Sequence, residues 1–208
     1  FSPIYWSLKY LLTQIFPSKY QIEANHLINL IFSFSAIIGI GKISKEFFNR
    51  QVGKIVFLIL FFYPIFFGHM AFNDKDMVLA VCHVWIFYLV IRYLKKQNIK
   101  DKINFYIIFL GVLSAVATGI HLFFLGTLIS VFLFVLIEIF FLKKFICKNF
   151  SKKKLYIDIG KIVLIFYFIL VLFWIDTHPN IFVLPFQYFL DFASLMSGIE
   201  QWRGWPFN

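Results

Sequence analysis

The sequence has few charged residues and few cysteines, and it lacks the common motifs of soluble enzymes. Only 14% of its 208 residues are Asp, Glu, Lys or Arg, whereas a soluble domain carries roughly 25%. Its 2 cysteines, Cys82 and Cys147, have neither the number nor the spacing of a disulfide framework or a zinc site. The chain contains no Gly-rich phosphate loop, no G-x-S-x-G elbow and no heptad repeat. These absences argue against most soluble catalytic classes.

What the chain has instead is hydrophobic sequence, which makes up 61% of its residues and recurs in long continuous runs. A run of roughly 20 apolar residues is enough to cross a bilayer core of about 30 Å. A transmembrane β-barrel would need alternating polar and apolar residues, whereas a helix satisfies its own backbone in lipid. We therefore predict an all-α, polytopic integral membrane protein with about six transmembrane helices, outer-face loops and interfacial helices.

The apolar runs predict six spans and two flanking segments. The predicted spans are residues 26–40, 55–67, 77–94, 103–116, 121–142 and 162–175. Residues 1–25 are expected to form an outer-face interfacial segment with a short helix over 5–16, because this run is too short to cross. The bundle then occupies residues 26–175, and residues 176–208 form an outer-face loop with an interfacial helix.

The net charge of +10 is spread over the loops, which favours membrane orientation over nucleic-acid binding. Sixteen of the 20 Lys and Arg residues lie in the last turn of the first, third and fifth spans or in the loops that follow them, which places them on one side. The positive-inside rule makes that side cytoplasmic. The other four are Lys9, Lys19, Lys75 and Arg203, and they share the outer side with most of the Asp and His residues. This asymmetry predicts a functional site at the outer membrane–water boundary.

The segment 63–77, Y-P-I-F-F-G-H-M-A-F-N-D-K-D-M, is the strongest candidate for that site. Pro64 and Gly68 are expected to break an apolar helix here. Polar residues then follow within a few positions, and the chain at once becomes apolar again. The pattern predicts a tight polar loop at the membrane surface, with more ionisable groups than a turn requires. These polar residues are His69, Asn73, Asp74, Lys75 and Asp76.

Each candidate residue has a chemical role and a structural alternative. Asp76, supported by Asp74, is the predicted catalytic acid, and its alternative is an acid that favours the start of a helix. Positions 76 and 83 share a helical face, so Asp76, His69 and His83 are the predicted ligands of a divalent cation such as Mg²⁺, Mn²⁺ or Zn²⁺.

Three basic side chains are predicted to bind a substrate phosphate, namely Lys75, His121 and Arg203. Lys75 alternatively neutralises its two Asp neighbours, and His121 is alternatively an interfacial histidine. His83 is alternatively a neutral histidine packed in the bundle. Glu138, near the cytoplasmic end of the fifth span, is expected to snorkel and to pair with a lysine.

The segments 26–54 and 63–77 resemble the GT-C membrane glycosyltransferases, especially bacterial relatives of the dolichyl-phosphate-mannose protein mannosyltransferases and of the aminoarabinose lipid A transferases. The family's outer-loop pattern N-x-K-D corresponds to Asn73-Asp74-Lys75-Asp76, and the resemblance covers about residues 21–96. It implies that Asp76 helps to hold a metal or the carrier phosphate. It also implies that His121 stands where family members often carry another basic residue, which is a departure from the pattern.

The resemblance implies transfer of a sugar from a polyprenyl-phosphate carrier to a protein, lipid or glycan acceptor, with the site facing the periplasm or exterior of a bacterial inner membrane. The family's principal acid lies in a first outer loop upstream, so we expect this chain to be an internal fragment that is inactive alone. The main alternative is a transporter or channel subunit with a polar outer vestibule, which predicts ionisable residues through the middle of the spans. A structural subunit without a site is the third possibility.

Overall fold

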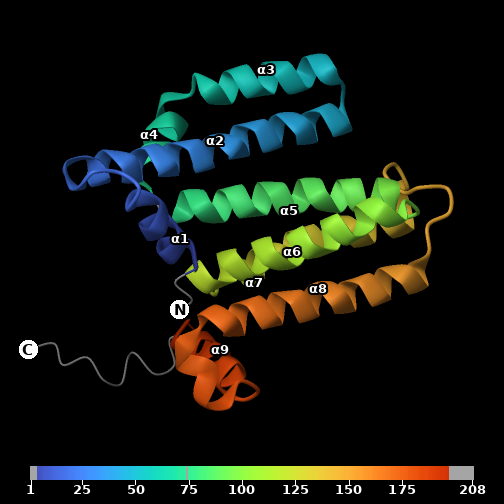
Figure 1. Cartoon of the computed structure of the whole chain (residues 1–208). Helices are drawn as coiled ribbons and strands as arrows, with labels where there is room; N and C mark the ends of the chain where they lie inside the picture. Colours follow the sequence, from blue (N-terminus) through green and yellow to red (C-terminus); the bar gives the residue numbers. More distant parts are fainter. Residues whose placement is uncertain (1–3, 74, 197–208) are drawn as a thin grey trace, which may run out of the picture.

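The predicted all-α, polytopic fold is confirmed by the arrangement of the helices. The computed structural model describes residues 4–73 and 75–196, and every element of secondary structure in these ranges is helical (Figure 1). Five helices are long and apolar enough to cross a membrane, and a bent helix pair raises the number to six if it counts as one span. The predicted number of about six spans therefore agrees with the structure.

The chain runs back and forth between two ends of a bundle (Figure 1). The candidate spans are in α2, α5, α6, α7 and α8. Helices α3 and α4 form the bent pair. The elements in order are α1 (Ile4–Thr13), η1 (Ser18–Tyr20), α2 (Gln21–Phe47), α3 (Arg50–Phe61), α4 (Pro64–Phe72), α5 (Asp76–Lys96), α6 (Lys100–Ile120), α7 (Phe124–Ile137), η2 (Glu138–Leu142), α8 (Lys152–Phe173), η3 (Ile175–Asn180) and α9 (Leu184–Met196).

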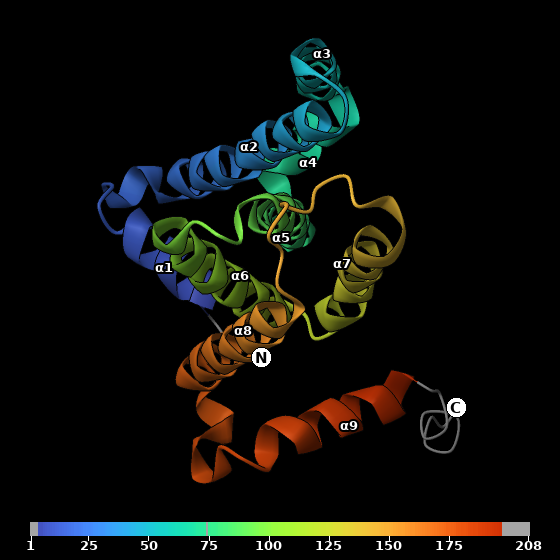
Figure 2. The same ribbon diagram turned by 90° about the vertical axis from the view of Figure 1, so that its right-hand side faces the viewer.

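Helix α5 forms the centre of the bundle. It packs against α2, α6 and α7, while α3 covers α2 and α8 covers α6 (Figure 2). The main apolar core follows α5 and includes the buried side chains of Val78, Cys82, Ile86 and Ile91. Helices α7 and α8 bury much less of their surface than α5 and α6. Their many exposed apolar side chains suit contact with lipid.

Glycine allows two pairs of helices to approach closely. A Cβ atom on Gly53 of α3 would lie 2.7 Å from the carbonyl oxygen of Gly41 on α2. A Cβ atom on Gly111 of α6 would lie 2.7 Å from Cγ2 of Ile165 on α8. Small residues at such crossings let helix backbones pack tightly where lipid supplies no hydrophobic driving force between helices.

Several helices extend beyond the predicted spans, so the expected basic loops are shorter. Helix α2 continues to Phe47, and Gly39 and Gly41 lie inside it rather than ending it. Helix α8 begins at Lys152, where the Ser151 hydroxyl accepts a hydrogen bond from the backbone N–H of Lys154 at 3.3 Å. Lysine is a good helix former and carries its charge to the membrane surface, so a helix does not end where its hydrophobic run ends.

The prediction that 63–77 is a loop is wrong for most of the segment. Pro64 begins α4, and only residues 73–75 connect α4 to α5. A proline fits the first turn of a helix because its missing N–H would have no partner there. The predicted span 55–67 therefore crosses a break at residues 62 and 63, where α3 and α4 are bent by 68°. Gly68 lies within α4 and does not break it.

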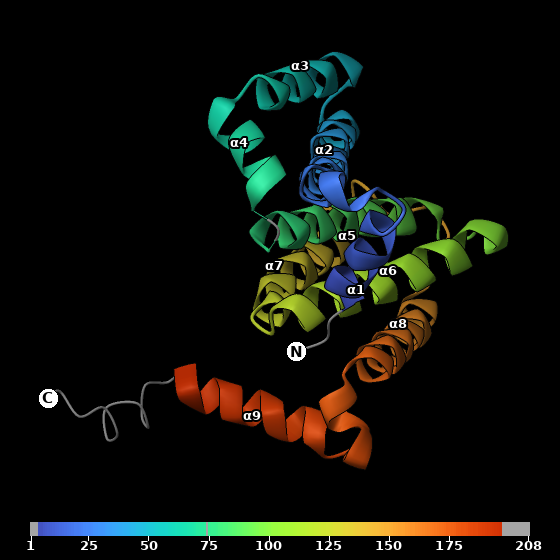
Figure 3. The ribbon, with the colours of Figure 1, turned by 60° about the vertical axis from the view of Figure 1, so that its left-hand side comes forward.

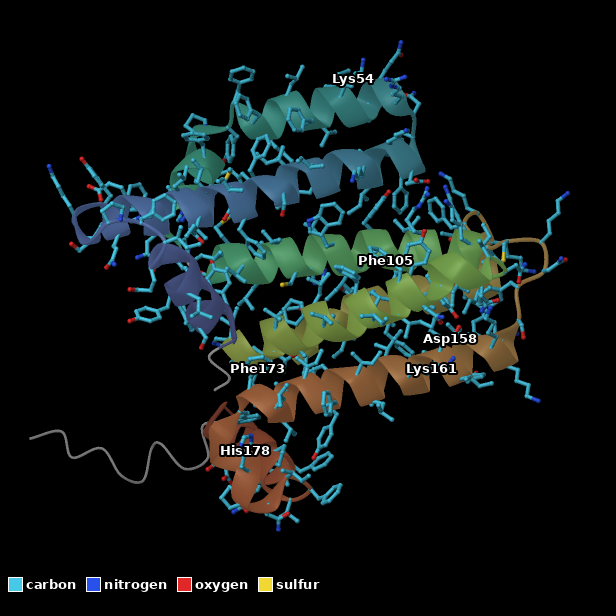
Figure 4. All side chains as sticks on the ribbon, viewed as in Figure 1. Lys54, Phe105, Asp158, Lys161, Phe173 and His178 are labelled. Carbon is cyan, nitrogen blue, oxygen red and sulfur yellow. The ribbon has the colours of Figure 1, made fainter. Side chains whose placement is uncertain are left out.

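One end of the bundle carries most of the basic residues, and partly buried ion pairs stabilise it. Lys54, Asp158 and Lys161 lie toward this end, opposite His178 (Figure 4). Glu46 of α2 accepts a hydrogen bond from Arg92 of α5 at 2.9 Å and another from Lys95. We call this end, with the connections after α2, α5 and η2, the basic end.

Two further acids at the basic end are buried. The hydroxyl of Tyr93 donates to the carboxylate of Asp158 at 2.8 Å, and the Asp158 side chain is only 2% exposed. Glu138 was expected to snorkel to the surface, and this expectation is wrong. Glu138 is fully buried, and its carboxylate accepts the backbone N–H of Phe145 because the chain turns back after η2.

Candidate functional site

Three of the described candidate residues, Lys75, Asp76 and His121, lie at the end of the bundle opposite the basic end. Helix α1, the end of α4, the start of α5 and the turn between α6 and α7 all lie there (Figure 3). We call this the polar end. Helix α1 packs against α2 and α6, and α4 leads from α3 into the start of α5.

Polar side chains of α1 and α2 hold the C-terminal end of α4 in place. The Tyr5 hydroxyl donates to Oδ1 of Asn29 at 2.9 Å, and Nδ2 of Asn29 donates to the carbonyl oxygen of Met70 at 2.9 Å. Nδ1 of His26 lies 3.1 Å from the carbonyl oxygen of Ala71, which can only accept, so this nitrogen carries the proton. These bonds satisfy carbonyls that the end of a helix leaves without partners. They fix the position from which the connection 73–75 begins.

Asn73 and Asp76 bind each other across the start of α5. Oδ1 of Asn73 accepts the backbone N–H of Asp76 at 3.0 Å, and Nδ2 of Asn73 donates to Oδ2 of Asp76 at 3.0 Å. The Asn73 side chain thus caps a backbone N–H at the start of α5, as the first residue of a capping box does, while the Asp76 carboxylate binds the Asn73 amide instead of a second backbone N–H. The Asp76 side chain nevertheless remains exposed, so its carboxylate is accessible from the surface.

The structure brings Lys75, Asp76 and His121 into one electrostatic group. Partial burial lowers the pKa of His121, the positive charge of Lys75 lowers it further, and the negative charge of Asp76 acts in the opposite direction. The side chains of Lys75, before α5, and of Asp76, at its first residue, therefore act on an imidazole from the α6–α7 turn. The His121 ring stacks on Phe123, with ring centroids 5.4 Å apart. We call Lys75, Asp76 and His121 the surface triad.

The predicted metal ligands are more dispersed. His69 is exposed on α4. His83 lies seven residues after Asp76, about 10 Å further along the α5 axis, and its ring contacts Phe124 edge-on at 6.1 Å. Within residues 4–73 and 75–196, no group of three or more His, Cys, Asp or Glu side chains is placed to hold a metal ion. The divalent-cation site stays a prediction.

Two predicted site residues, Asp74 and Arg203, lie outside the residues that the structure describes. Sequence reasoning missed Asn29, which bridges α1 and α4 from the middle of an apolar helix. A lone asparagine in a predicted span is a signal that could have found it, because buried polar groups in a membrane need partners. Its partners Tyr5 and Met70 are distant in sequence and cannot be identified from the sequence alone.

Comparison of the chain with protein-family models, with curated proteins and with solved structures gives no match. The resemblance to GT-C glycosyltransferases therefore stays a prediction that depends on the N-x-K-D pattern. What the structure adds is the geometry of the polar end.

Proposed function

We propose that the chain is part of a membrane glycosyltransferase that moves a sugar from a polyprenyl-phosphate carrier to a protein, lipid or glycan acceptor on the outer side of the membrane. The observation that carries the proposal is the surface triad, in which an ammonium, a carboxylate and an imidazole meet at one end of a bundle of apolar helices. A lipid-linked donor keeps its prenyl chain in the bilayer, so its phosphate and sugar reach such a site at the surface.

Each member of the triad has a role in this reaction. Lys75 provides a positive point charge for the carrier phosphate, and protonated His121 would add a second donor. Asp76 would stabilise the departing phosphate through a bound cation. A carboxylate of the enzyme would accept the proton of the attacking hydroxyl. The proposed membrane is the bacterial inner membrane, with the triad facing the periplasm or exterior.

The proposal is tested with the full-length gene product reconstituted in lipid and supplied with polyprenyl-phosphate sugars. Asp76→Asn should lower the rate of transfer by about 100-fold or more, as loss of a group that stabilises developing charge does. Glu23→Gln is the matched control, because Glu23 is an exposed acid in the first turn of α2 at the same end. Unchanged transfer in this control is expected.

The capping role of Asp76 needs its own control. Asn73→Ala removes the side chain that binds Asp76 but leaves the carboxylate in place. If Asp76 acts in transfer, Asn73→Ala should lower thermal stability with a much smaller effect on rate than Asp76→Asn. Equal rates of transfer in wild type and Asp76→Asn would show that Asp76 only stabilises the start of α5 and takes no part in transfer.

A transporter is the second candidate, and one observation favours it. Among the described residues, three buried polar atoms inside α2, α5 and α6 have no hydrogen-bond partner, namely Ser33 Oγ, His83 Nδ1 and Thr118 Oγ1. Buried polar groups in spans often mark a solute pathway. Flux of a solute into proteoliposomes that His83→Leu abolishes, with no sugar transfer to any acceptor, would establish the transporter instead.

A further inference from the structure

A groove between α2 and α3 lies at the basic end, away from the surface triad. It has a volume of about 390 Å³ and is lined by the last turns of α2 and the first turns of α3. Helix α3 packs on α2 and α4 at the edge of the bundle (Figure 1). Most of the lining side chains are exposed, so a ligand can enter the groove from the membrane.

The groove carries positive charge from both helices. Its basic lining residues are Lys42 and Lys45 of α2 and Arg50 and Lys54 of α3, and no residue in the lining described for the groove has a carboxylate. The ammonium of Lys42 is held on the α5 side, with Nζ 4.9 Å from the centroid of the Trp85 ring. The other three cations are exposed, and Lys54 is visible near the α2–α3 turn in Figure 4.

These three cations have no counter-charge from the protein. They form no hydrogen bond or ion pair with any side chain that the structure describes. Glu46, the acid next to Lys45 in the sequence, pairs instead with Arg92 and Lys95 of α5. Like charges around one groove repel each other, so an anion bound between them is favoured.

The part of the groove further from the α2–α3 turn is apolar. Ile38 lies seven residues before Lys45 on α2, and Phe57 lies seven residues after Arg50 on α3, which is about 10 Å along each helix axis. Leu58 extends this apolar wall and is exposed. The groove therefore changes from cationic to apolar in the direction that leads into the membrane, as a phospholipid changes from phosphate to acyl chain.

We propose that this groove binds an anionic phospholipid, with the phosphate at Lys45, Arg50 and Lys54 and an acyl chain along Ile38 and Leu58. Basic pockets between transmembrane helices bind anionic headgroups in this way. A soluble phosphate would leave the apolar wall uncovered, so the occupant is a lipid. The proposal does not require glycosyl transfer, because it concerns binding at the opposite end from the surface triad.

The test uses the full-length protein in detergent, with phosphatidylglycerol and phosphatidylcholine of identical acyl chains added in equal amounts. Native mass spectrometry counts the lipid that stays bound. The wild type should retain phosphatidylglycerol in preference to phosphatidylcholine. The double variant Lys45→Gln/Arg50→Gln should weaken binding of phosphatidylglycerol by about tenfold or more, the loss expected when two cations near an anionic lipid are removed.

Lys148→Gln/Lys153→Gln is the matched control, because it removes two exposed lysines of the same end that lie outside the groove. Its affinity for phosphatidylglycerol should equal that of the wild type. The double variant Lys45→Arg/Arg50→Lys keeps both charges and should retain binding. Phosphatidylglycerol should also raise the unfolding temperature of the wild type and of the charge-retaining variant, which is a second readout of binding to the folded protein.

Glycerol phosphate, a phosphate headgroup without acyl chains, distinguishes a lipid from a soluble phosphate compound. At the same concentration as phosphatidylglycerol it should not displace the bound lipid, whereas displacement would overturn the assignment of a lipid. Equal losses of affinity in Lys45→Gln/Arg50→Gln and Lys148→Gln/Lys153→Gln would mean that the total charge of the basic end attracts the lipid, and would overturn the groove as its site. A wild type that binds the two lipids equally would also overturn the proposal.

Discussion

At the scale of single residues, the pKa of His121 depends on the charges of its neighbours Lys75 and Asp76. Its pKa lies below the ordinary value of about 6.5 because of burial, and secondarily because of Lys75. Lys75→Gln should therefore raise the pKa of His121, and Asp76→Asn should lower it further. Histidine NMR titration in nanodiscs measures both shifts. A pKa that falls or stays constant in Lys75→Gln would contradict the proximity of these three side chains.

The same shift fixes how stability depends on pH. Because folded His121 binds its proton less tightly than the unfolded chain does, the unfolded state carries more protons between the two pKa values. His121 therefore lowers the free energy of unfolding as pH falls through the ordinary histidine range. Above that range His121 is neutral in both states and does not change the free energy of unfolding. Replacing His121 with Gln should flatten this part of the stability profile.

Asn29 shows how a buried polar side chain can position a functional segment. Asn29→Leu keeps the number and branching of the side-chain heavy atoms but removes both the bond from Tyr5 and the bond to Met70. We expect a loss of about 1–3 kcal/mol in the free energy of unfolding, because buried polar partners remain unsatisfied. Hydrogen–deuterium exchange should rise in the last turn of α4 and in residues 73–76.

The matched control for that prediction is Asn104→Leu, because Asn104 is exposed on α6. Its unfolding temperature and its exchange in α4 should stay close to those of the wild type. If Asn29→Leu behaves like Asn104→Leu, the bridge between α1 and α4 does not stabilise the polar end.

At the scale of elements, the α6–α8 contact depends on the absence of a side chain. Gly111→Val should force α6 and α8 apart, since a Cβ atom there meets Ile165 at 2.7 Å and the carbonyl of Ile162 at 3.1 Å. Overpacking of this kind costs about 1–3 kcal/mol in the free energy of unfolding. Thermal unfolding in nanodiscs measures the effect.

Gly126 on α7 offers the comparison for Gly111. A Cβ atom on Gly126 meets no atom within 4 Å, so Gly126→Val should change stability by no more than about 0.5 kcal/mol. Equal losses in the two variants would mean that the close approach of α6 and α8 does not account for the effect of Gly111→Val.

The sequence predicted which elements exist better than it predicted their ends. Hydropathy identified the spans because lipid requires continuous apolar helices. It placed the end of α2 too early, because helix geometry continues through Lys42 and Lys45, which reach the surface by their long side chains. It interpreted Pro64 as a helix breaker, although proline is also favoured at the start of a helix.

The candidate site was predicted as a local pattern, and its supports were not. The polar residues of 73–76 are adjacent in sequence, so composition alone marks them. Their position depends on His26 and Asn29, which contact α4 from more than 40 residues away. No periodicity encodes such a contact, because it depends on how α2 packs against α4.

At the scale of the whole molecule, acids and bases are distributed so that the two ends differ in character. At the basic end, Glu46 pairs with Arg92 and Lys95, and Asp158 is bound by Tyr93. These acids therefore bind partners on neighbouring helices of the bundle, while most of the lysines around them remain exposed. At the polar end, the carboxylate of Asp76 is exposed beside Lys75. One end is suited to hold the protein in its orientation, and the other is suited to bind a ligand.

This asymmetry makes a prediction about orientation. In a background where both cysteines are alanine, Ser18→Cys places a thiol at the polar end and Lys148→Cys places one at the basic end, and both positions are exposed. The reagent is a membrane-impermeant maleimide, applied to spheroplasts, in which any outer membrane has been removed and the inner membrane is intact. It should label Ser18→Cys in these cells. It should label Lys148→Cys only after the inner membrane is permeabilised, because basic loops stay cytoplasmic. Both thiols should react in detergent, which confirms that they are accessible. The reverse pattern would place the surface triad in the cytoplasm, where it would meet soluble nucleotide-linked donors, and it would remove the reason to propose a polyprenyl-phosphate substrate.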